Sequence, residues 1–454
     1  MVTFAALGWL FVVGASESPV LRGPEWNRAL ATIRAEQLKE HLIVLSSDAY
    51  EGRCAGEAGC ERAAGYIIER LKSWKLEPGG DDGGYLQYFE FRVRGGKGGR
   101  AKTANIVAVL EGTDEKLRPE NVVLGAHYDH VGTAGSLDAG RAGGATDTDK
   151  VWNGADDNGS GTVALLEIAE AFVETGIKPR RSIAFIWFSA EEQGLLGSAH
   201  YCASPLGKPV AMVNLDMVGR NPDKALEISG MGSMRDQGWF TSIDRALEVA
   251  PSLKIEKQAG SVPGSDDYSF IRTRVPAVAL FSGYHKEYHK IGDHVDLIDF
   301  ERMATIAKFS MTLVGDLADS DSVPEFEPPL MQTGQGKILG IEHEVLEDSE
   351  LDQLGRAPNQ GAVRVTSVLP GSQAEKIGLR AGDVIVSVRG RDLSRDSAGS
   401  NLRRAIRGAA YGEDHPLKIL RDGAEVELKF RFERKESDDA KPEEASRGAS
   451  GTRG

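Results

Sequence analysis

The sequence predicts an α/β fold for its larger part, with a central, mostly parallel sheet and helices on both faces. Short apolar runs rich in Val, Ile and Ala are typical of the inner strands of a covered sheet. Stretches with helical periodicity, such as residues 60–74 and 160–176, alternate with these runs. The runs expected to form strands are residues 105–112, 121–129, 182–190, 211–219 and 277–283.

Composition limits the class of protein. The 454 residues are 41% hydrophobic and 27% charged, which is typical of a globular protein and excludes a polytopic membrane protein, a coiled coil and a wholly disordered chain. The net charge is −14, and the first 336 residues carry −13 of it. Nucleic-acid binding needs a basic surface, so we expect no nucleic-acid partner.

The chain divides into segments by composition. We expect the larger, α/β domain to occupy residues 28–318 and a second, β-rich domain to occupy 337–432. Residues 319–336 are rich in Asp, Ser, Pro and Gly and predict a linker. Residues 433–454 have no bulky apolar residue and predict a disordered tail.

The first 15 residues resemble an export signal. Residues 3–15 are almost wholly apolar, too few to anchor the chain in a bilayer, and small residues precede Ser16. A basic start is missing, and a buried first helix is the alternative. Export predicts a periplasmic or secreted protein without a stable membrane anchor. An oxidising compartment would allow Cys54 and Cys60 to pair, with Cys202 left over.

Polar residues fall at the ends of the predicted strands, where ligands gather in open α/β sheets. Each motif taken alone has an ordinary structural alternative, such as a helix cap, an acidic first helical turn or a core histidine. Together they supply hard oxygen ligands and imidazoles, which suit Zn²⁺ or, less well, Mn²⁺ or Co²⁺. The strand-end residues are His127, Asp129, Asp156, Asp157, Glu191, Glu192 and Asp216.

Three of the nine histidines lie within ten residues, at His285, His289 and His294. This segment can add imidazole ligands to the carboxylates. With one bridging Asp, the set divides into two groups, as in a two-metal hydrolase with metals about 3.5–4 Å apart.

The motifs GAHYDHVG, NGADDNGSG, AEEQGLLGS, NLDMVG and YHKIGDHVDLID resemble, in this order, those of co-catalytic di-zinc aminopeptidases. The resemblance covers about residues 35–315 and includes secreted leucyl aminopeptidases, glutamate carboxypeptidase and glutaminyl cyclase. It implies a zinc exopeptidase-like fold and two Zn²⁺ per chain. It also implies a cis peptide between Asp156 and Asp157.

The resemblance also implies roles for individual residues. His127 and Asp216 would hold one zinc, Glu192 and His289 the other, and Asp156 would bridge them. Glu191 would be the general base, and Asp129 would orient His127. Relatives often have Ser-Asp-His where this chain has Ser265-Asp266-Asp267, so a histidine at the rim is missing.

Residues 337–432 resemble a PDZ domain of the kind attached to bacterial trypsin-like proteases, through ILGIEHE and GAVRVTSVLPGSQAEKIGLRAGDVIVSVRGRDL. Leu339-Gly340-Ile341 would be the loop that receives the carboxylate of a C-terminal peptide, which adds as a strand. A purely structural cap on the peptidase is the alternative.

The expected function is an exported aminopeptidase that removes N-terminal residues from peptides with a free N-terminus, using a two-zinc-activated water and Glu191 as general base. The alternatives are carboxypeptidase or glutaminyl cyclase activity, or a non-catalytic PDZ scaffold. Glu191 and a full ligand set argue against the scaffold.

Overall fold

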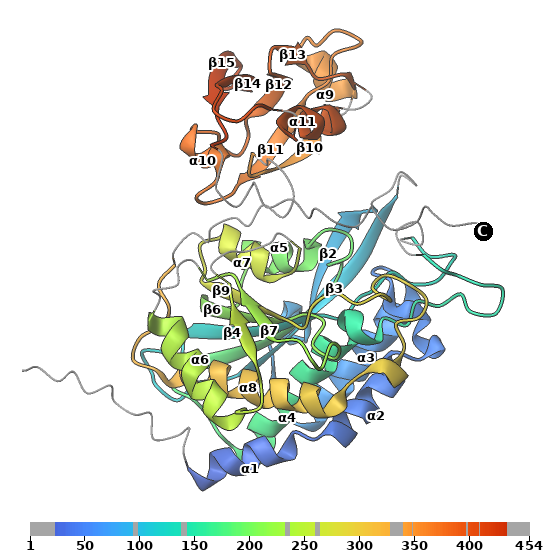
Figure 1. Cartoon of the computed structure of the whole chain (residues 1–454), viewed down its shortest axis with the longest axis vertical. Coiled ribbons are helices and arrows are strands. Elements are labelled where there is room, and N and C mark those ends of the chain that lie inside the picture. The colour runs from blue at the N-terminus through green and yellow to red at the C-terminus, as the bar shows by residue number, and fades with distance from the viewer. Residues whose placement is uncertain are drawn as a thin grey trace, which may run out of the picture. The chain divides into compact units, whose positions relative to one another are not determined.

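The computed structural model describes most of the chain as two compact units, Met1–Pro329 and Leu330–Gly454 (Figure 1). The expected signal segment 1–15, most of the expected linker 319–336 and nearly all of the tail 433–454 lie outside the described residues. The described residues are 23–93, 99–137, 143–231, 237–258, 264–326, 339–346, 348–395, 398–407 and 409–433.

The first unit contains a nine-stranded sheet with the order β1-β3-β5-β4-β6-β9-β7-β8, and β2 pairs with β3. The central strands β5, β4, β6 and β9 run parallel, while β3 and β7 join this centre antiparallel. The predicted mostly parallel centre is therefore confirmed, with antiparallel strands added at both sides. The strands are β1 (Glu77–Pro78), β2 (Leu86–Arg92), β3 (Arg100–Leu110), β4 (Glu120–His127), β5 (Ser182–Phe188), β6 (Lys208–Leu215), β7 (Leu226–Ser229), β8 (Ile255–Lys257) and β9 (Ala277–Phe281).

Helices cover both faces of this sheet (Figure 1). Figure 1 shows α1, α2, α4, α6 and α8 on one face and α5 and α7 on the other. Besides single-turn segments, the helices are α1 (Pro24–Thr32), α2 (Ala35–Leu45), α3 (Ala58–Ser73), α4 (Gly161–Thr175), α5 (Leu196–Ala203), α6 (Gln237–Val249), α7 (Asp267–Arg272) and α8 (Phe300–Asp319).

Side chains of the inner strands alternate between two hydrophobic cores. Phe185 and Trp187 of β5 pack in the core beneath α4 and α8, whereas Ile186 and Phe188 pack in the core beneath α5 and α7. Because successive strand residues point to opposite faces, an apolar run is buried on both sides. This arrangement holds the strands rigidly and fixes where their carboxyl ends lie.

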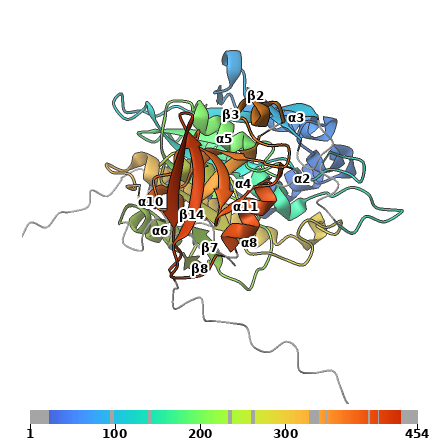
Figure 2. The ribbon, with the colours of Figure 1, turned by 90° about the horizontal axis from the view of Figure 1, so that it is seen from above.

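The second unit is a six-stranded antiparallel sheet with the order β10-β11-β12-β14-β15, and β13 pairs with β12. Figure 2 looks down on this unit and shows α11 beside the sheet. Its elements are β10 (Ile341–Val345), α9 (Asp348–Gln353), β11 (Val363–Val368), α10 (Gln373–Lys376), β12 (Val384–Val388), β13 (Arg391–Asp392), α11 (Ala398–Arg407), β14 (His415–Arg421) and β15 (Ala424–Phe430).

Local sequence explains the turns of the second sheet. Asp422 and Gly423 form the two-residue loop between β14 and β15, and both have positive φ, of 53° and 79°. An Asp-Gly pair is favoured in such hairpins because it tolerates this backbone conformation.

Gly340 has a φ of 84°, and an added Cβ would lie 2.2 Å from the Cβ of Ser372. A side chain at position 340 would therefore displace the segment before β10.

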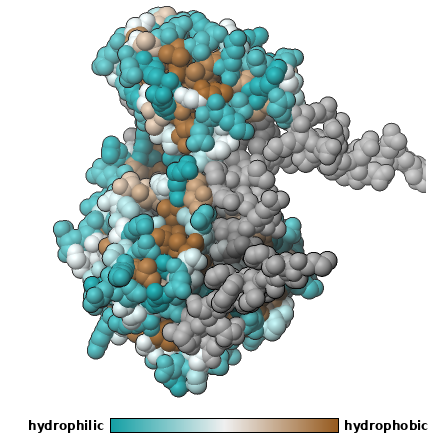
Figure 3. Space-filling model, turned by 90° about the vertical axis from the view of Figure 1, so that its left-hand side faces the viewer, coloured by the Kyte–Doolittle hydropathy of each residue, from teal (hydrophilic) through white to brown (hydrophobic). Residues whose placement is uncertain are grey.

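The surface of both units is mostly hydrophilic on the face drawn in Figure 3, with apolar residues collected in smaller patches. Among the residues that the structure describes, no helix has the length and apolar character needed to cross a membrane.

The cysteines differ from the sequence-based expectation. Cys54 and Cys60 are both buried and are not joined by a disulfide. The Sγ of Cys60 lies 3.7 Å from the Oγ of Ser189, a contact that holds it on the inner side of α3. Burial raises the pKa of the Cys60 thiol to about 12, so this thiol is protected from oxidation at neutral pH.

Candidate metal centre

The carboxyl ends of β4, β5 and β6 bring the predicted polar residues to one edge of the sheet. His127 is the last residue of β4, Asp216 follows β6, and Glu191 and Glu192 follow β5. His289 reaches the same place from the segment after β9. Residues that are far apart in the sequence therefore meet because parallel strands end at a common edge.

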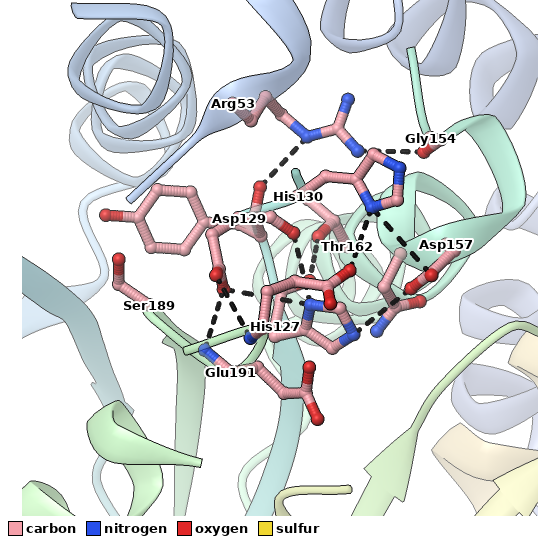
Figure 4. A network of polar contacts seen from close by, with 12 residues as sticks. Arg53, His127, Asp129, His130, Gly154, Asp157, Thr162, Ser189 and Glu191 are labelled. Carbon is pink, nitrogen blue, oxygen red and sulfur yellow. Dashed lines mark hydrogen bonds and ion pairs between the residues drawn. The ribbon is translucent and has the colours of Figure 1, made fainter. Parts of the chain in front are cut away.

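Two groups of ligand atoms share the carboxylate of Asp157. One oxygen, Oδ1, lies 3.5 Å from the Nε2 of His127, which is also 3.5 Å from the Oδ1 of Asp216. The other oxygen, Oδ2, lies 3.0 Å from the Nε2 of His289, which is 3.1 Å from the Oε1 of Glu192. Figure 4 shows the side chains of His127 and Asp157 directed toward each other. The arrangement places one carboxylate between two histidine–carboxylate pairs.

Asp156 does not occupy this central position, which corrects the sequence-based expectation by one residue. Its Oδ1 accepts a hydrogen bond of 2.7 Å from the backbone N–H of Gly219, and its Oδ2 lies 3.3 Å from the Nε2 of His285. Neighbouring side chains in this non-helical segment point in different directions, so only one of the two aspartates can face both groups. The cis peptide is likewise one residue later, between Asp157 and Asn158.

The segment that carries Asp157 is held on several sides. The Oδ2 of Asp293 accepts hydrogen bonds of 3.0 Å from the backbone N–H groups of both Asp156 and Asp157. The side chain of Asn158 donates to the carbonyl of Leu215 and accepts from the N–H of Gly161, the first residue of α4. These bonds tie the segment to β6 and to the start of α4, and they define the direction of the Asp157 side chain.

Arg53 supports the same segment from the N-terminal side, a role that motif reasoning missed. The guanidinium is fully buried and donates to the carbonyls of Asn153, Gly154 and Tyr128 at 2.7–2.9 Å. Figure 4 shows the bond to Gly154. Arg53 thereby links the loop before Asp157 to the residue that follows His127. In the sequence, only its place in the Glu-Gly-Arg turn after α2 could have indicated this role for Arg53.

His130 is a second residue that the sequence analysis did not select. Its Nδ1 lies 3.0 Å from the Oε1 of Glu192 and 3.8 Å from the Oδ2 of Asp157. It is 1% exposed, and its ring lies edge-on to that of His289 with centroids 5.8 Å apart. The motif HYDH contains this histidine, but period-two alternation in a strand directs attention to His127 and Asp129 instead.

Asp129 links the ends of β4 and β5. Its carboxylate accepts hydrogen bonds from the backbone N–H groups of Glu191 (3.1 Å) and Glu192 (3.4 Å), as Figure 4 shows for Glu191. The Nδ1 of His127 lies 3.1 Å from the backbone carbonyl of Asp129 and 3.7 Å from its Oδ1. Asp129 is therefore placed to orient both His127 and the two glutamates.

The adjacent glutamates have opposite electrostatic environments. Burial, with the negative charges of Glu192 and Asp266, raises the pKa of Glu191 well above its ordinary value. Burial also acts on Glu192, but its contacts with His130 and His289 outweigh burial and hold its pKa well below the ordinary value. Two neighbouring carboxylates whose pKa values are shifted in opposite directions are typical of sites that use one as a proton carrier and the other as a fixed anion.

The other two histidines of the cluster lie elsewhere. His285 is paired with Asp156, and its Nδ1 lies 3.4 Å from the Oε2 of Glu287. The Nε2 of His294 lies 3.4 Å from the Oδ2 of Asp149, and its side chain is 38% exposed. Only His289 of the three lies in the two groups around Asp157.

The segment Ser265-Asp266-Asp267 borders the site. The Oγ of Ser265 donates a hydrogen bond of 2.5 Å to the Oδ2 of Asp216, which orients that carboxylate. Asp266 is fully buried, and burial raises its pKa to about 7. Asp267 is the first residue of α7 and is 2% exposed, so the position where relatives often have a histidine is not at the rim of this site.

These residues fit divalent metal ions. Two ligand atoms that are each 2.0–2.1 Å from a tetrahedral Zn²⁺ lie about 3.3–3.4 Å apart, close to the separations around Asp157. Among the described residues, the Oδ2 of Asp157 and the Oδ1 of Asp216 are buried and receive no hydrogen bond. Buried carboxylate oxygens are costly unless they are paired with protons or metal ions.

The chain is similar to known peptidases and to PDZ domains. Residues 105–314 match Peptidase family M28, and residues 338–431 match the PDZ domain. Leucine aminopeptidase 2 from Arthroderma otae is 33% identical over 227 residues, which cover 43% of this chain and 41% of that protein. Leucine aminopeptidase 1 from Coccidioides posadasii is 29% identical over 232 residues, covering 47% of this chain and 55% of that protein. The chain thus spans about half or less of the length of these curated relatives.

Solved structures share the fold of the first unit. An aminopeptidase from Aneurinibacillus sp. strain AM-1 has a TM-score of 0.51 and 17% identity, and covers 67% of this chain and 98% of that chain. LapA from Legionella pneumophila has a TM-score of 0.50 and 21% identity, with 65% of this chain and 76% of that chain covered. Residues 105–314 are thus similar to peptidase family M28, and residues 338–431 are similar to a PDZ domain.

Proposed function

We propose that the first unit is a zinc-dependent aminopeptidase that removes N-terminal residues from peptides. His127, Asp157 and Asp216 would hold one zinc ion, and Asp157, Glu192 and His289 would hold the other. The observation that carries the proposal is the Asp157 carboxylate, whose two oxygens face one histidine–carboxylate pair each. Asp157 takes the bridging role that the sequence analysis gave to Asp156.

The chemistry of the site divides between the ions and the protein. When bound, two zinc ions would lower the pKa of a water and polarise the carbonyl of the scissile bond. Glu191 follows the same strand as Glu192 but is not in either ligand group, and burial raises its pKa above the ordinary value, which makes it a stronger proton acceptor than an exposed carboxylate. It would take a proton from the attacking water and deliver it to the leaving amine. Asp129 would hold Glu191 in place through the backbone N–H.

Aminopeptidase activity is favoured over carboxypeptidase and cyclase activity because the curated relatives described above bear the name leucine aminopeptidase.

Export to the periplasm or the outside stays a prediction, since its evidence lies in residues 1–15.

A chromogenic assay tests the proposed activity. The purified protein should cleave aminoacyl-p-nitroanilides, lose activity after dialysis against a chelator and regain it with Zn²⁺. N-acetylated forms of the same substrates should not be cleaved, because the enzyme needs a free N-terminus. Cleavage of N-blocked peptides with a free C-terminus would support a carboxypeptidase, and absence of all hydrolysis in zinc-loaded protein would contradict the proposal.

We also propose that the second unit binds the C-terminus of a peptide along β10. This strand lies at the edge of its sheet, the position at which a peptide would add as a further strand. Gly340 and Leu339 precede β10, and their carbonyls are bound by Leu369 and Ala374, so this segment is ordered rather than free to move.

Removal of the PDZ domain should leave the chemistry intact. The cut should follow Phe326 rather than residue 318, the predicted end of the α/β domain, because Arg181 donates to the carbonyl of Ser320 and Phe326 packs against the hydrophobic core of the first unit. Every proposed metal ligand precedes this point. The shortened enzyme should keep kcat/KM for a dipeptide within about twofold of the full-length value.

Longer substrates are expected to respond differently, because a second binding point raises their effective concentration. Peptides with a C-terminus that fits the PDZ domain should lose kcat/KM on truncation, and their C-terminally amidated forms should lose little. Loss of dipeptide activity in a folded, zinc-loaded truncation would show that the PDZ domain helps to build the active site.

A further inference from the structure

A second group of metal-ligand side chains lies between helices of the first unit, outside the peptidase site. His41 of α2 and Glu167 and Glu170 of α4 each offer one ligand atom, and these atoms all lie within 4.8 Å of one another. Glu167 and Glu170 are three residues apart, so they share one face of α4. None of the three belongs to the groups around Asp157.

The central carboxylate of this group is buried. The side chain of Glu167 is 1% exposed, and its Oε1 receives no hydrogen bond from the described residues. This oxygen lies 3.5 Å from the Nε2 of His41. The separation is too long for a good hydrogen bond but is close to the distance of about 3.3–3.4 Å between two ligands of one tetrahedral Zn²⁺.

The histidine is oriented by a third helix. The Nδ1 of His41 lies 2.6 Å from the Oη of Tyr66 on α3. When Nδ1 carries the proton and donates to Tyr66, the lone pair of Nε2 points toward Glu167. Metal-ligating histidines commonly hold their other nitrogen in such a contact.

The group opens into a cavity of about 460 Å³ that both His41 and Glu170 line. Glu40 and Glu69 add negative charge to this cavity, and Arg70 is the cation that opposes it. The Arg70 guanidinium lies over the Tyr66 ring, 3.6 Å from its centroid. An ion can therefore reach His41 and Glu170 from solvent, and the ligand atom of Glu167 lies within 4.8 Å of theirs.

We propose that His41, Glu167 and Glu170 form a second zinc site that fastens α2 to α4, with water as the remaining ligand. One imidazole and two carboxylates favour Zn²⁺ over Ca²⁺ or Mg²⁺, which prefer oxygen ligands alone. The site lies on the outside of the helical layer, so its role is to stabilise the fold rather than to take part in peptide hydrolysis.

Metal analysis separates this site from the peptidase centre. Protein loaded with Zn²⁺ and freed of excess metal by gel filtration should lose one zinc per chain in Glu167→Gln and in Glu170→Gln. Glu170 is only partly buried, so its variant should fold even if Glu167→Gln does not. Glu174→Gln, one turn further along α4, is the matched control and should keep the full zinc content. All three variants should keep kcat/KM on a dipeptide within about twofold.

Crystals soaked in Zn²⁺ provide a direct readout. An anomalous difference map recorded above the zinc edge should show a peak between His41 and Glu167 in the wild type and none in Glu170→Gln. Two results would overturn the proposal: equal zinc content in the wild type and both variants, or an anomalous map with peaks only at Asp157. In either case Glu167 and His41 would share a proton instead of a metal ion. Neither result depends on the peptidase assay, so failure of the proposed activity is recognised separately.

Discussion

Glu191→Gln should lower kcat by about 10²–10⁴-fold while leaving the zinc content and the fold unchanged. The amide fills the same space as the carboxylate but cannot accept a proton from the attacking water. Its backbone N–H still donates to Asp129, so the segment after β5 keeps its position. The measurement is kcat on an aminoacyl-p-nitroanilide, together with zinc per chain by mass spectrometry.

Two controls separate a catalytic loss from a structural one. Glu256→Gln changes an exposed glutamate of β8 and should leave kcat unchanged. The melting temperature of Glu191→Gln should equal or exceed that of the wild type, because removal of the half-buried negative charge relieves repulsion with Glu192 and Asp266. A kcat within threefold of the wild type would rule out Glu191 as the general base.

Asp157→Asn should release both zinc ions and abolish detectable peptidase activity. The carboxylate supplies one oxygen to each group of ligands, and an amide replaces one of these oxygens with a nitrogen that donates protons and cannot bind the second ion. Dialysis against a weak chelator, followed by zinc analysis, measures the loss. The zinc bound by His41, Glu167 and Glu170 should remain in this variant.

Asp156→Asn is the matched neighbour for this experiment. Its side-chain oxygen can still accept the hydrogen bond from Gly219, and the ion pair with His285 lies away from Asp157. We therefore expect both peptidase zinc ions to be retained. If Asp156→Asn loses the two ions and Asp157→Asn keeps them, Asp156 is the bridge and our assignment is reversed.

The sequence was sufficient for the class of fold and for the edge of the sheet where the site lies. Apolar runs such as residues 182–190 can be buried only inside a covered sheet, and parallel strands end at a common edge. His127 and Asp216 are therefore brought close together by topology alone. The second domain was recognised from its resemblance to PDZ domains, and its Asp-Gly hairpin has a strong local preference for the observed turn.

Tertiary structure decided which of two neighbouring aspartates faces the metal groups. The direction of Asp157 depends on Asp293, whose carboxylate accepts a hydrogen bond from the Asp157 backbone N–H, and on Arg53, which donates to the carbonyl of Gly154. These partners are 136 and 104 residues away from Asp157 in the chain, and the backbone around Asp157 has no regular period. His130 was missed for a related reason, since it lies beyond the end of β4 where strand alternation no longer applies. The group at His41 and Glu167 exists only because α2 packs on α4. Local sequence sets the preferences of a strand or a turn, whereas the direction of a side chain in an irregular segment is set by partners that only the folded chain brings near.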